Sequence, residues 1–277
     1  MMARGKIEEN KANPLQWIIY LGVIVGVIAP LLPQFLWPFA KSWFFPSLTP
    51  SVWGLNAWQY IGNPNNQVFE SVRNSLVIAV LVTFISVLLG VPAGRALGMY
   101  RFRGKSLIEL FILAPSIIPG LAVIMGIHVM FIKLGLAETL LGVVLVHLVP
   151  TIPYMTISMS GVFANYDPDF EEQARSLGAT PFKTFFLITL PAVFPGIVTG
   201  AMFAFLISWG QYILTVLIGG GRVITLPLLL FAFATSRDNP LMSALSIVFL
   251  LPAIIILFFT SKFLSGKFST MGGFGNI

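Results

Sequence analysis

The chain has 277 residues, of which 57% are hydrophobic and 9% are charged, and its mean hydropathy is +0.91. In soluble domains about a quarter of the residues are charged, so this chain has too few charges to cover a soluble protein. A soluble globular protein is thereby excluded, and an all-α polytopic membrane protein is predicted. The absence of cysteine excludes disulfides and thiolate metal sites.

About six apolar stretches are long enough to cross a bilayer, which takes about 20 residues. The first is too long for the apolar region of a signal peptide and has no small-residue cleavage site, so we expect it to be retained. Pro30 and Pro33 loosen its end, and a wetter segment rich in Trp, Pro and Asn follows. The six predicted spans cover residues 15–38, 71–99, 107–132, 136–163, 192–219 and 242–264.

The basic residues lie between the apolar stretches, where they orient helices in the bilayer. The net charge of +6 therefore does not indicate a nucleic-acid partner. If the N-terminus is cytoplasmic, eleven of the 16 Lys and Arg residues share its side: Arg4, Lys6, Lys11, Arg95, Arg101, Arg103, Lys105, Arg175, Lys183, Lys262 and Lys267. This bias predicts that both termini, and the charged segment before the fifth span, face the cytoplasm.

That charged segment reads EEQARSLGATPFKTFFLITLP and covers residues 171–191. Asp167 can cap a helix at its start, and Gly178 suits the left-handed residue that ends such a helix. Thr180 and Pro181 repeat the start signal for a second short helix, which we expect to stop before Pro191. The pattern fits either an amphipathic connector at the membrane surface or a rigid element that docks in a groove of a cytoplasmic protein.

A family resemblance favours the docking element. The segment resembles the EAA loop of ABC-importer permeases, which has an EAA triplet, a glycine six residues after its Glu, and I-x-L-P ten residues beyond the glycine. The matching residues are Glu172-Gln173-Ala174, Gly178-Ala179, Ile188 and Leu190-Pro191, with Gln173 in the place of the usual central Ala. RNSLVIAV (73–80), MYRFRGK (99–105) and LGLAETLLGVVLVH (134–147) also look like segments of this family.

The resemblance implies the type I importer permease fold, with six spans and a cytoplasmic two-helix coupling loop over residues 164–191. Residues 1–68 would then hold a cytoplasmic tail, the first span and an outer segment. Residues 69–265 would form a permease core of five spans, and residues 266–277 a cytoplasmic tail. Such permeases pair with a second permease, two cytoplasmic ATPases and an extracytoplasmic solute-binding protein. ATP and Mg are bound by the ATPase, so we expect no cofactor in this chain.

The resemblance also implies how the coupling loop works, since the EAA loop sits in a cleft of the ATPase and moves when ATP closes the ATPase dimer. Glu172 is then the expected charged anchor toward the ATPase, and Gly178 permits a fixed angle between two stiff helices. The residues expected to take part in coupling are Glu171, Glu172, Ala174, Arg175, Leu177, Gly178, Ala179, Leu190 and Pro191.

The solute stays open between two branches of the family. Leu177 before the motif glycine gives SLGA, the form seen in polyamine, phosphonate and ferric-iron permeases, where sugar permeases usually have Asp. SWGQYI (208–213) and the tail FLSGKFSTMGG are instead similar to sugar permeases. Polyamines are multiple cations that need carboxylates along their path, yet Asp238 is the only acid between residues 192 and 264. A polyamine, a phosphonate or a similar small organic solute is favoured, and a sugar or glycerol-phosphate-type solute is the alternative.

Few polar residues lie within the predicted spans. The candidates for contact with a passing solute are Asn74, Ser75, Ser208, Trp209, Gln211 and Tyr212, although ordinary polar contacts between helices would also explain them. His128 and His147 are isolated in spans three and four. We expect them to form hydrogen bonds with neighbouring helices rather than bind a metal, because no second ligand is suitably spaced.

Two other classes of protein are disfavoured. A membrane enzyme needs paired acids, a Ser/His set or a metal cluster, and neither these nor a phosphate-binding Gly-x-x-x-x-Gly-Lys occur. A standalone channel or secondary transporter gives the charged segment no role and needs acids for ion coupling that the spans lack. The expected function is a non-enzymatic permease subunit of an ATP-driven importer in the cell inner membrane.

Overall fold

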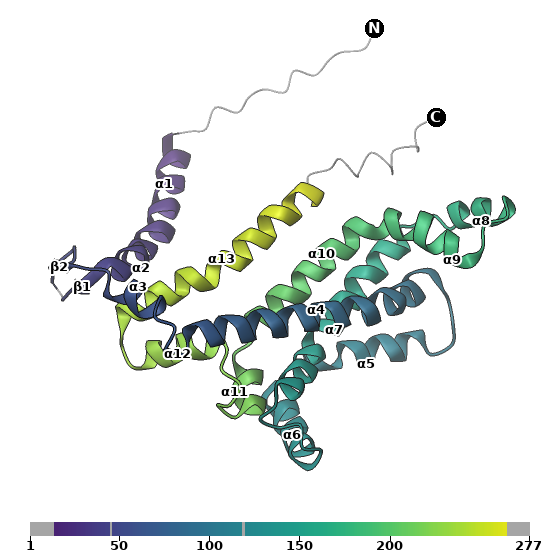
Figure 1. The fold of residues 1–277 in the computed structure, drawn as a ribbon. Coiled ribbons are helices and arrows are strands. Elements are labelled where there is room, and N and C mark those ends of the chain that lie inside the picture. The colour runs from purple at the N-terminus through teal and green to yellow at the C-terminus, as the bar shows by residue number, and fades with distance from the viewer. Residues whose placement is uncertain (1–13, 45, 118–119, 265–277) are drawn as a thin grey trace, which may run out of the picture.

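The computed structural model describes residues 14–44, 46–117 and 120–264 (Figure 1). The regular structure is helical except for strands β1 (Ala40–Ser42) and β2 (Val52–Trp53), which form a short antiparallel hairpin with Ala40 opposite Trp53. The predicted all-α membrane architecture is confirmed in this sense. The predicted cytoplasmic tails, before the first span and over residues 266–277, lie outside the described residues.

Within these described ranges, five helical stretches are long and apolar enough to cross a membrane: Ile19–Phe39, Val68–Met99, Leu140–Ala164, Pro181–Trp209 and Asn239–Ser261. The first is irregular because prolines interrupt its hydrogen bonding. It consists of α1 (Pro14–Ile28), the 3₁₀ turn η1 (Ala29–Leu31), α2 (Leu32–Leu36) and the 3₁₀ turn η2 (Trp37–Phe39). Its apolar side chains are largely exposed, as a helix that faces lipid requires.

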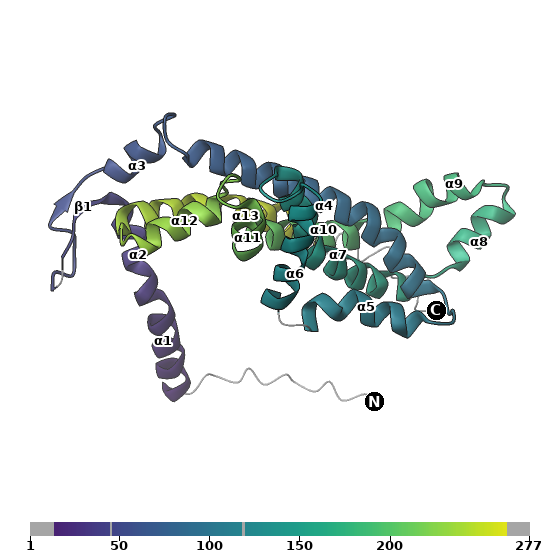
Figure 2. The same ribbon diagram turned by 90° about the horizontal axis from the view of Figure 1, so that it is seen from below.

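Three long helices make the centre of the bundle. α4 (Val68–Met99), α7 (Leu140–Ala164) and α10 (Leu190–Trp209) pack against one another, and both views show α4 lying along α7 (Figures 1 and 2). The closest approach runs along Gly90, Gly94 and Gly98 of α4. A Cβ atom would lie 2.5 Å from Cγ of Met155 at Gly90 and 2.6 Å from the carbonyl oxygen of Ser160 at Gly98. Glycine at every fourth position therefore lets the two helices meet.

The remaining helices surround this centre. α13 (Asn239–Leu264) packs on α10 and on α12 (Leu226–Thr235), while α3 (Asn56–Ile61) lies near the β hairpin. Two side chains of α4 hold the start of α12. Asn74 donates from Nδ2 to the carbonyl oxygen of Ile224 (3.0 Å), and Ser75 accepts from the backbone N–H of Leu226 (2.8 Å). One end of the long helix is thereby tied to the last third of the chain.

The prediction of one continuous third span was wrong. The structure has two separate helices, α5 (Lys105–Ile117) and α6 (Gly120–Lys133), which run in different directions (Figures 1 and 2). Pro115 lies inside α5, and a proline removes a backbone donor and disturbs the preceding turn. Apolar composition over residues 107–132 indicated membrane burial, but it carried no information on the direction of the chain.

The predicted end of the fifth span was also wrong. α10 ends at Trp209, and α11 (Ile213–Gly219) starts as a separate helix after residues 210–212. Gly210 follows the last residue of α10, where glycine favours a break. The break places Gln211 and Tyr212 in a non-helical turn and not in the middle of a helix.

A third correction concerns Pro191, where the second loop helix was expected to stop. The structure continues from α9 (Pro181–Thr184) through a π-helical turn, η3 (Phe185–Thr189), directly into α10. Pro191 is the second residue of α10, and the π-helical turn before it accommodates the backbone hydrogen bond that the proline cannot donate. The wider π-helical turn precedes this proline and keeps the helix continuous.

Candidate functional site

The coupling loop forms two short helices at one end of the bundle, beyond the ends of α7 and α10 (Figures 1 and 2). Asp167 accepts from the backbone N–H of Asp169 (3.0 Å) at the start of α8 (Asp169–Ser176). Gly178 has a φ of +85°, the left-handed conformation predicted for it. Thr180 caps α9 by accepting from the backbone N–H of Lys183 (3.4 Å). The first predicted helix, the two start signals and the glycine corner are confirmed, whereas the second helix continues into α10.

Glu171 points into the protein, and only 6% of its surface is exposed. Its two carboxylate oxygens accept from one guanidinium nitrogen of Arg95, at 2.9 and 2.7 Å. Thr189, in the π-helical turn, donates its hydroxyl to the same carboxylate (2.7 Å). Arg175 makes a longer contact of 3.5 Å from the more exposed side. One buried acid thus joins α4, α8 and η3.

The other predicted coupling residues lie around the corner between the two helices. Glu172 and Leu177 are exposed, with 90% of Leu177 accessible, whereas Ala174 is buried beneath α8. Ala179 closes the corner by donating from its backbone N–H to the carbonyl oxygen of Ala174 (3.0 Å). Leu190 and Pro191 begin α10 and so connect the corner to the membrane bundle.

A cavity of about 410 Å³ opens between α8 and the end of α7. Glu171, Glu172 and Arg175 line it from the loop, and Tyr166 lines it from the connection after α7. Burial raises the pKa of the Tyr166 phenol above its usual value. This cavity combines charged and aromatic groups at the surface that the loop presents.

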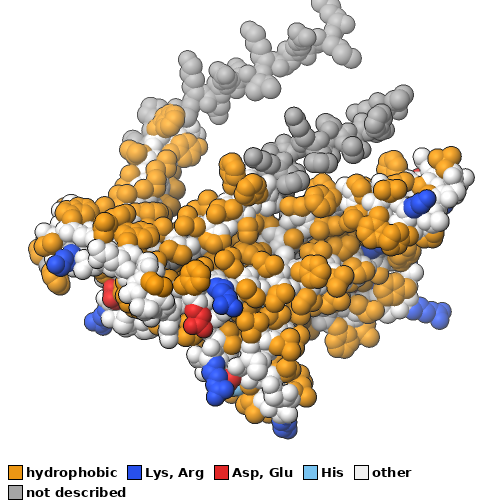
Figure 3. Space-filling view, in the orientation of Figure 1, with side chains coloured by type: hydrophobic (Ala, Val, Ile, Leu, Met, Phe, Trp, Pro, Cys, Tyr) orange, Lys and Arg blue, Asp and Glu red, His pale blue; other side chains and the backbone are white. Residues whose placement is uncertain are grey.

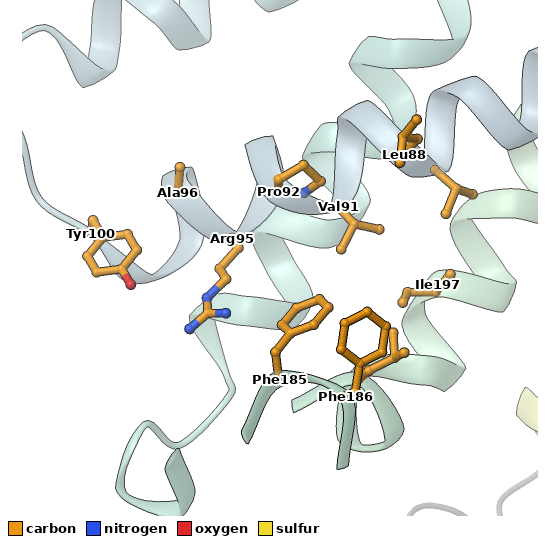
Figure 4. A pocket seen from close by; sticks show the side chains of 11 residues that line it. Leu88, Val91, Pro92, Arg95, Ala96, Tyr100, Phe185, Phe186 and Ile197 are labelled. Carbon is orange, nitrogen blue, oxygen red and sulfur yellow. The ribbon is translucent and has the colours of Figure 1, made fainter. Parts of the chain in front are cut away.

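On the other side of Arg95 lies a mainly apolar groove of about 520 Å³ (Figure 4). Val91, Pro92 and Arg95 line it from α4, and Phe185 and Phe186 from the π-helical turn. The guanidinium carbon of Arg95 lies 5.9 Å from the centre of the Phe185 ring. A cation at this distance from an aromatic face is stabilised by it. Arg95 is therefore held by Glu171 on one side and by an aromatic ring on the other.

A second polar cluster lies deep in the bundle around His147, of which 1% is exposed. Nδ1 of His147 is 3.0 Å from the Ser208 hydroxyl, and Nε2 is 3.0 Å from the Thr215 hydroxyl. Because Thr215 donates to the carbonyl oxygen of Gln211 (3.0 Å), it accepts the proton of Nε2, and Nδ1 accepts from Ser208. Thr151 extends the cluster by donating to the carbonyl oxygen of His147 (2.9 Å).

The expected hydrogen bonding of His147 to a neighbouring helix is confirmed. Its ring joins Ser208 on one side of the α10–α11 break to Thr215 on the other. His128 is partly buried in α6. Across the described part of the chain, no group of three or more His, Asp or Glu side chains is arranged to hold a metal ion.

The structure separates the predicted solute-contacting residues. Trp209 is buried between the rings of Phe205 (5.9 Å) and Phe249 (5.6 Å), and its indole donates to the carbonyl oxygen of Phe249 (3.1 Å). Tyr212 packs on Phe231, with ring centres 4.4 Å apart. The side chains of Asn74, Ser75 and Ser208 form hydrogen bonds within the protein. These five predicted residues therefore contact other parts of the chain.

Among the predicted solute-contacting residues, Gln211 borders a mainly apolar cavity. The cavity measures about 370 Å³ and lies where α5, α6 and α7 meet the α10–α11 break. A polar amide at a helix break, surrounded by apolar side chains, can form hydrogen bonds with a small solute. The other lining residues are Pro115, Val123, Ile124, Ile127, Val149, Pro150, Ile213 and Leu214.

Sequence reasoning missed the role of Arg95 and Thr189. The signal for Arg95 was present, because a charged residue at the end of an apolar span needs a partner. Its partner lies 76 positions away, so no local pattern could identify it.

Hydrophobic side chains cover most of the face drawn in Figure 3, with few charges among them, as expected for a lipid-embedded surface.

Comparison with known proteins gives a consistent result. Residues 87–269 match the family model described as binding-protein-dependent transport system inner membrane component. The putrescine transport system permease protein PotI of Escherichia coli (strain K12) is 28% identical over 266 residues, or 92% of each chain. The molybdate/tungstate transport system permease protein WtpB of Pyrococcus abyssi (strain GE5 / Orsay) is 37% identical over 137 residues, 50% of this chain and 55% of that one.

The fold itself has a solved counterpart. A chain from the crystal structure of a bacterial ABC transporter involved in the import of the acidic polysaccharide alginate superposes with a TM-score of 0.70. Its sequence is 20% identical, and the match covers 91% of this chain and 98% of that one. With the family model spanning most of the sequence, the chain belongs to the binding-protein-dependent inner membrane components and is a permease subunit of an ABC importer.

Proposed function

We propose that this permease pairs with a second permease subunit, two cytoplasmic ATPases and an extracytoplasmic solute-binding protein. The dependence on a binding protein is part of the family description. ATP and Mg are bound by the ATPases, which supply the chemical energy. Both termini lie on the cytoplasmic side together with the coupling loop, a placement supported by the eleven of 16 basic residues that share that side.

The coupling loop is the surface that docks on the ATPase. One observation carries this proposal: the loop is a two-helix corner whose inner face is anchored by side-chain contacts and whose tip is exposed. Glu171 and Ala174 are buried against the bundle, while Glu172 and Leu177 are exposed at the tip. An exposed leucine beside a carboxylate suits a groove that is apolar with a basic rim. Gly178 permits the left-handed turn at the corner between the two helices.

The passage for the solute runs past Gln211, between α5, α6, α7 and the α10–α11 break. We favour a small organic solute of the polyamine or phosphonate kind, because a putrescine permease is similar over 92% of the chain. A sugar or glycerol-phosphate-type solute is the second candidate. It is favoured by the lining of the cavity at Gln211, which has no carboxylate to balance a cation.

The docking surface is tested with Glu172→Ala and Gly178→Val in the reconstituted complex. Both variants should keep the folded permease but uncouple ATP hydrolysis from uptake, since the first removes the anchor and the second strains the corner. Glu138→Ala is the matched control, because Glu138 forms an exposed ion pair with Arg222 outside the loop (3.0 Å). Normal ATP-driven uptake in the two loop variants would contradict the coupling role.

The solute is tested separately, with the complex in proteoliposomes that enclose ATP. Uptake of labelled putrescine, a labelled alkylphosphonate and labelled glycerol 3-phosphate is compared in the presence of the binding protein. Gln211→Leu should reduce uptake of the accepted solute several-fold without changing co-purification of the ATPase. Unchanged uptake in this variant would remove Gln211 from the passage.

A further inference from the structure

A side-chain contact connects the coupling loop to the membrane bundle, in addition to the covalent connections through α7 and α10. Along the chain, α8 follows α7 through residues 165–168 and reaches α10 through α9 and η3. α4 is not a chain neighbour of the loop, since it leads from α3 to α5. The ion pair between Arg95 and Glu171 bridges 76 positions of sequence and joins α4 to α8 directly.

This ion pair has the features of a stiff connection. The Arg95 side chain is 20% exposed and that of Glu171 is 8% exposed, so water screens the pair weakly. Both carboxylate oxygens are bonded to the guanidinium, and Thr189 fixes the orientation of the carboxylate from a third element. The centre of the Phe185 ring lies 5.9 Å from the guanidinium carbon (Figure 4). If Arg95 turned away, the buried Glu171 carboxylate would keep only the Thr189 hydroxyl and the longer contact with Arg175.

Arg175 offers an internal comparison. It contacts the same carboxylate at 3.5 Å, but it belongs to α8 itself and its side chain is 54% exposed. A contact within one helix ties the loop to nothing else. Of the two arginines bonded to Glu171, Arg95 is the one that links separate elements.

We propose that Arg95 and Glu171 form the joint through which movement of the coupling loop reaches α4, so that α4 and α10 move together when the ATPase moves the loop. The inference rests on the proposed docking of the loop to the ATPase and adds a second route to the covalent route through α10. Arg95 is in this sense a positioning residue, because it acts through α4 and does not contact the ATPase or the solute.

The geometry of α4 gives this joint a long reach. α4 has 32 residues and so extends about 48 Å as one helix. Arg95 lies near its last turn, and near its first turns Asn74 and Ser75 bond to residues 224 and 226 at the start of α12. A tilt of α4 imposed at Arg95 would therefore also displace the start of α12 at the opposite end of the bundle, because those two hydrogen bonds hold it to α4.

The joint can be tested by distance measurement, because the chain has no native cysteine. Spin labels are placed at Lys183→Cys on α9 and Phe84→Cys on α4, both exposed positions. The complete transporter in lipid nanodiscs is compared without nucleotide and with ATP plus vanadate. In the otherwise unchanged complex we expect one narrow distance that stays the same in both states. Arg95→Ala should shift or broaden that distance in the ATP–vanadate state.

Two further variants keep the test decisive if Arg95→Ala assembles poorly. The exchanged pair, Arg95→Glu with Glu171→Arg, should restore assembly and the single distance. Arg175→Ala, the matched control, should behave as the unchanged complex. An unshifted distance in Arg95→Ala, or an exchanged pair that restores neither property, would overturn the joint. If the ATPase does not co-purify with the unchanged permease, the proposed docking fails first, so the two failures are distinguishable.

Discussion

One polar cluster connects α7 to its neighbours and another connects α4 to the coupling loop, and the two clusters consist of different polar groups. In the middle of the bundle His147 is 1% exposed and joins hydroxyls of α10 and α11 in a neutral network. At the coupling-loop end the Arg95 side chain is 20% exposed and joins Glu171 in an ion pair. The bundle centre excludes water and makes charge expensive, so hydroxyl and imidazole groups connect the helices there. Nearer the surface a full ion pair can be hydrated in part and still be held firmly.

The two clusters are also connected through the packing of α4 on α7. Ser86 of α4 donates to Thr151 of α7 (2.9 Å), and Thr151 bonds onward to the carbonyl oxygen of His147. Gly90 and Gly94 follow on α4, and Arg95 is the next residue. The close packing of α4 on α7 therefore holds both clusters in place at once, and the following substitutions separate their contributions.

Gly94→Val should have the largest effect, because it breaks both clusters together. A Cβ atom at Gly94 would lie 2.9 Å from the backbone nitrogen of Ser160 and would also overlap the side chain of Met159. Forcing α4 from α7 should destabilise the protein by about 3 kcal/mol. The unfolding temperature and the yield of monodisperse permease in detergent measure this loss. Gly161→Val is the control, since a Cβ there meets no atom within 4 Å, and an equal loss in both would contradict the packing argument.

His147→Leu should break the neutral cluster alone. Ser208 and Thr215 lose their shared partner inside the bundle, which should cost about 2 kcal/mol of unfolding free energy. The leucine has no hydrogen-bonding atom, so the α10–α11 break becomes looser and labelling of a cysteine at Gln211 should become faster. His128→Leu, at a partly buried position in α6, serves as the control. Equal stability of the two variants would show that the network around His147 contributes nothing.

Thr189→Val should weaken the ion-pair cluster without dissolving it. The carboxylate of Glu171 loses one donor but keeps Arg95, so the expected loss is about 1 kcal/mol. Thr199→Val is a suitable control, because its hydroxyl bonds only to the carbonyl oxygen of Pro195 one turn earlier in its own helix (2.9 Å). Chemical denaturation of the two variants in the same detergent measures the difference. A loss no greater at Thr189 than at Thr199 would argue against a firmly held Glu171.

Arg175→Ala should have the smallest effect. The Arg175 side chain is 54% exposed, and exposed ion pairs contribute about 0–1 kcal/mol. Its small contribution should fall further in high salt, whereas the contribution of the less exposed Arg95 should persist. Unfolding measured at low and high salt for Arg175→Ala and Arg95→Ala tests this contrast. The same salt response for both variants would mean that the Arg95 pair is as well solvated as a surface pair.

Local signals account for the parts that the sequence predicted well. Hydrophobic runs identified most membrane helices because a bilayer crossing demands about 20 apolar residues in a row. The loop helices and their corner followed from Asp167, Thr180 and Gly178, whose capping bonds and left-handed φ of +85° involve only near neighbours. The family motif lies in the same loop.

The exceptions share a physical cause. Apolar composition does not determine the directions of α5 and α6, the break after Trp209 or the continuation through Pro191, although Pro115, Gly210 and Pro191 lie at or near these points. Glu171 was expected to take part in coupling, and the position of α4 sets which of the two adjacent acids turns inward. Assignment of Glu172 to the ATPase interface stays a prediction.

By itself the sequence determined the class of protein, most of the membrane helices and the local geometry of the coupling loop. Each of these depends on composition or on residues a few positions apart. Only the tertiary structure decided that Glu171 meets Arg95, 76 positions away, and that His147 joins the two sides of the α10–α11 break. Such pairs depend on the register of the packed helices. The close contact of the α4 glycines with α7 helps to set this register, and no short stretch of sequence contains it.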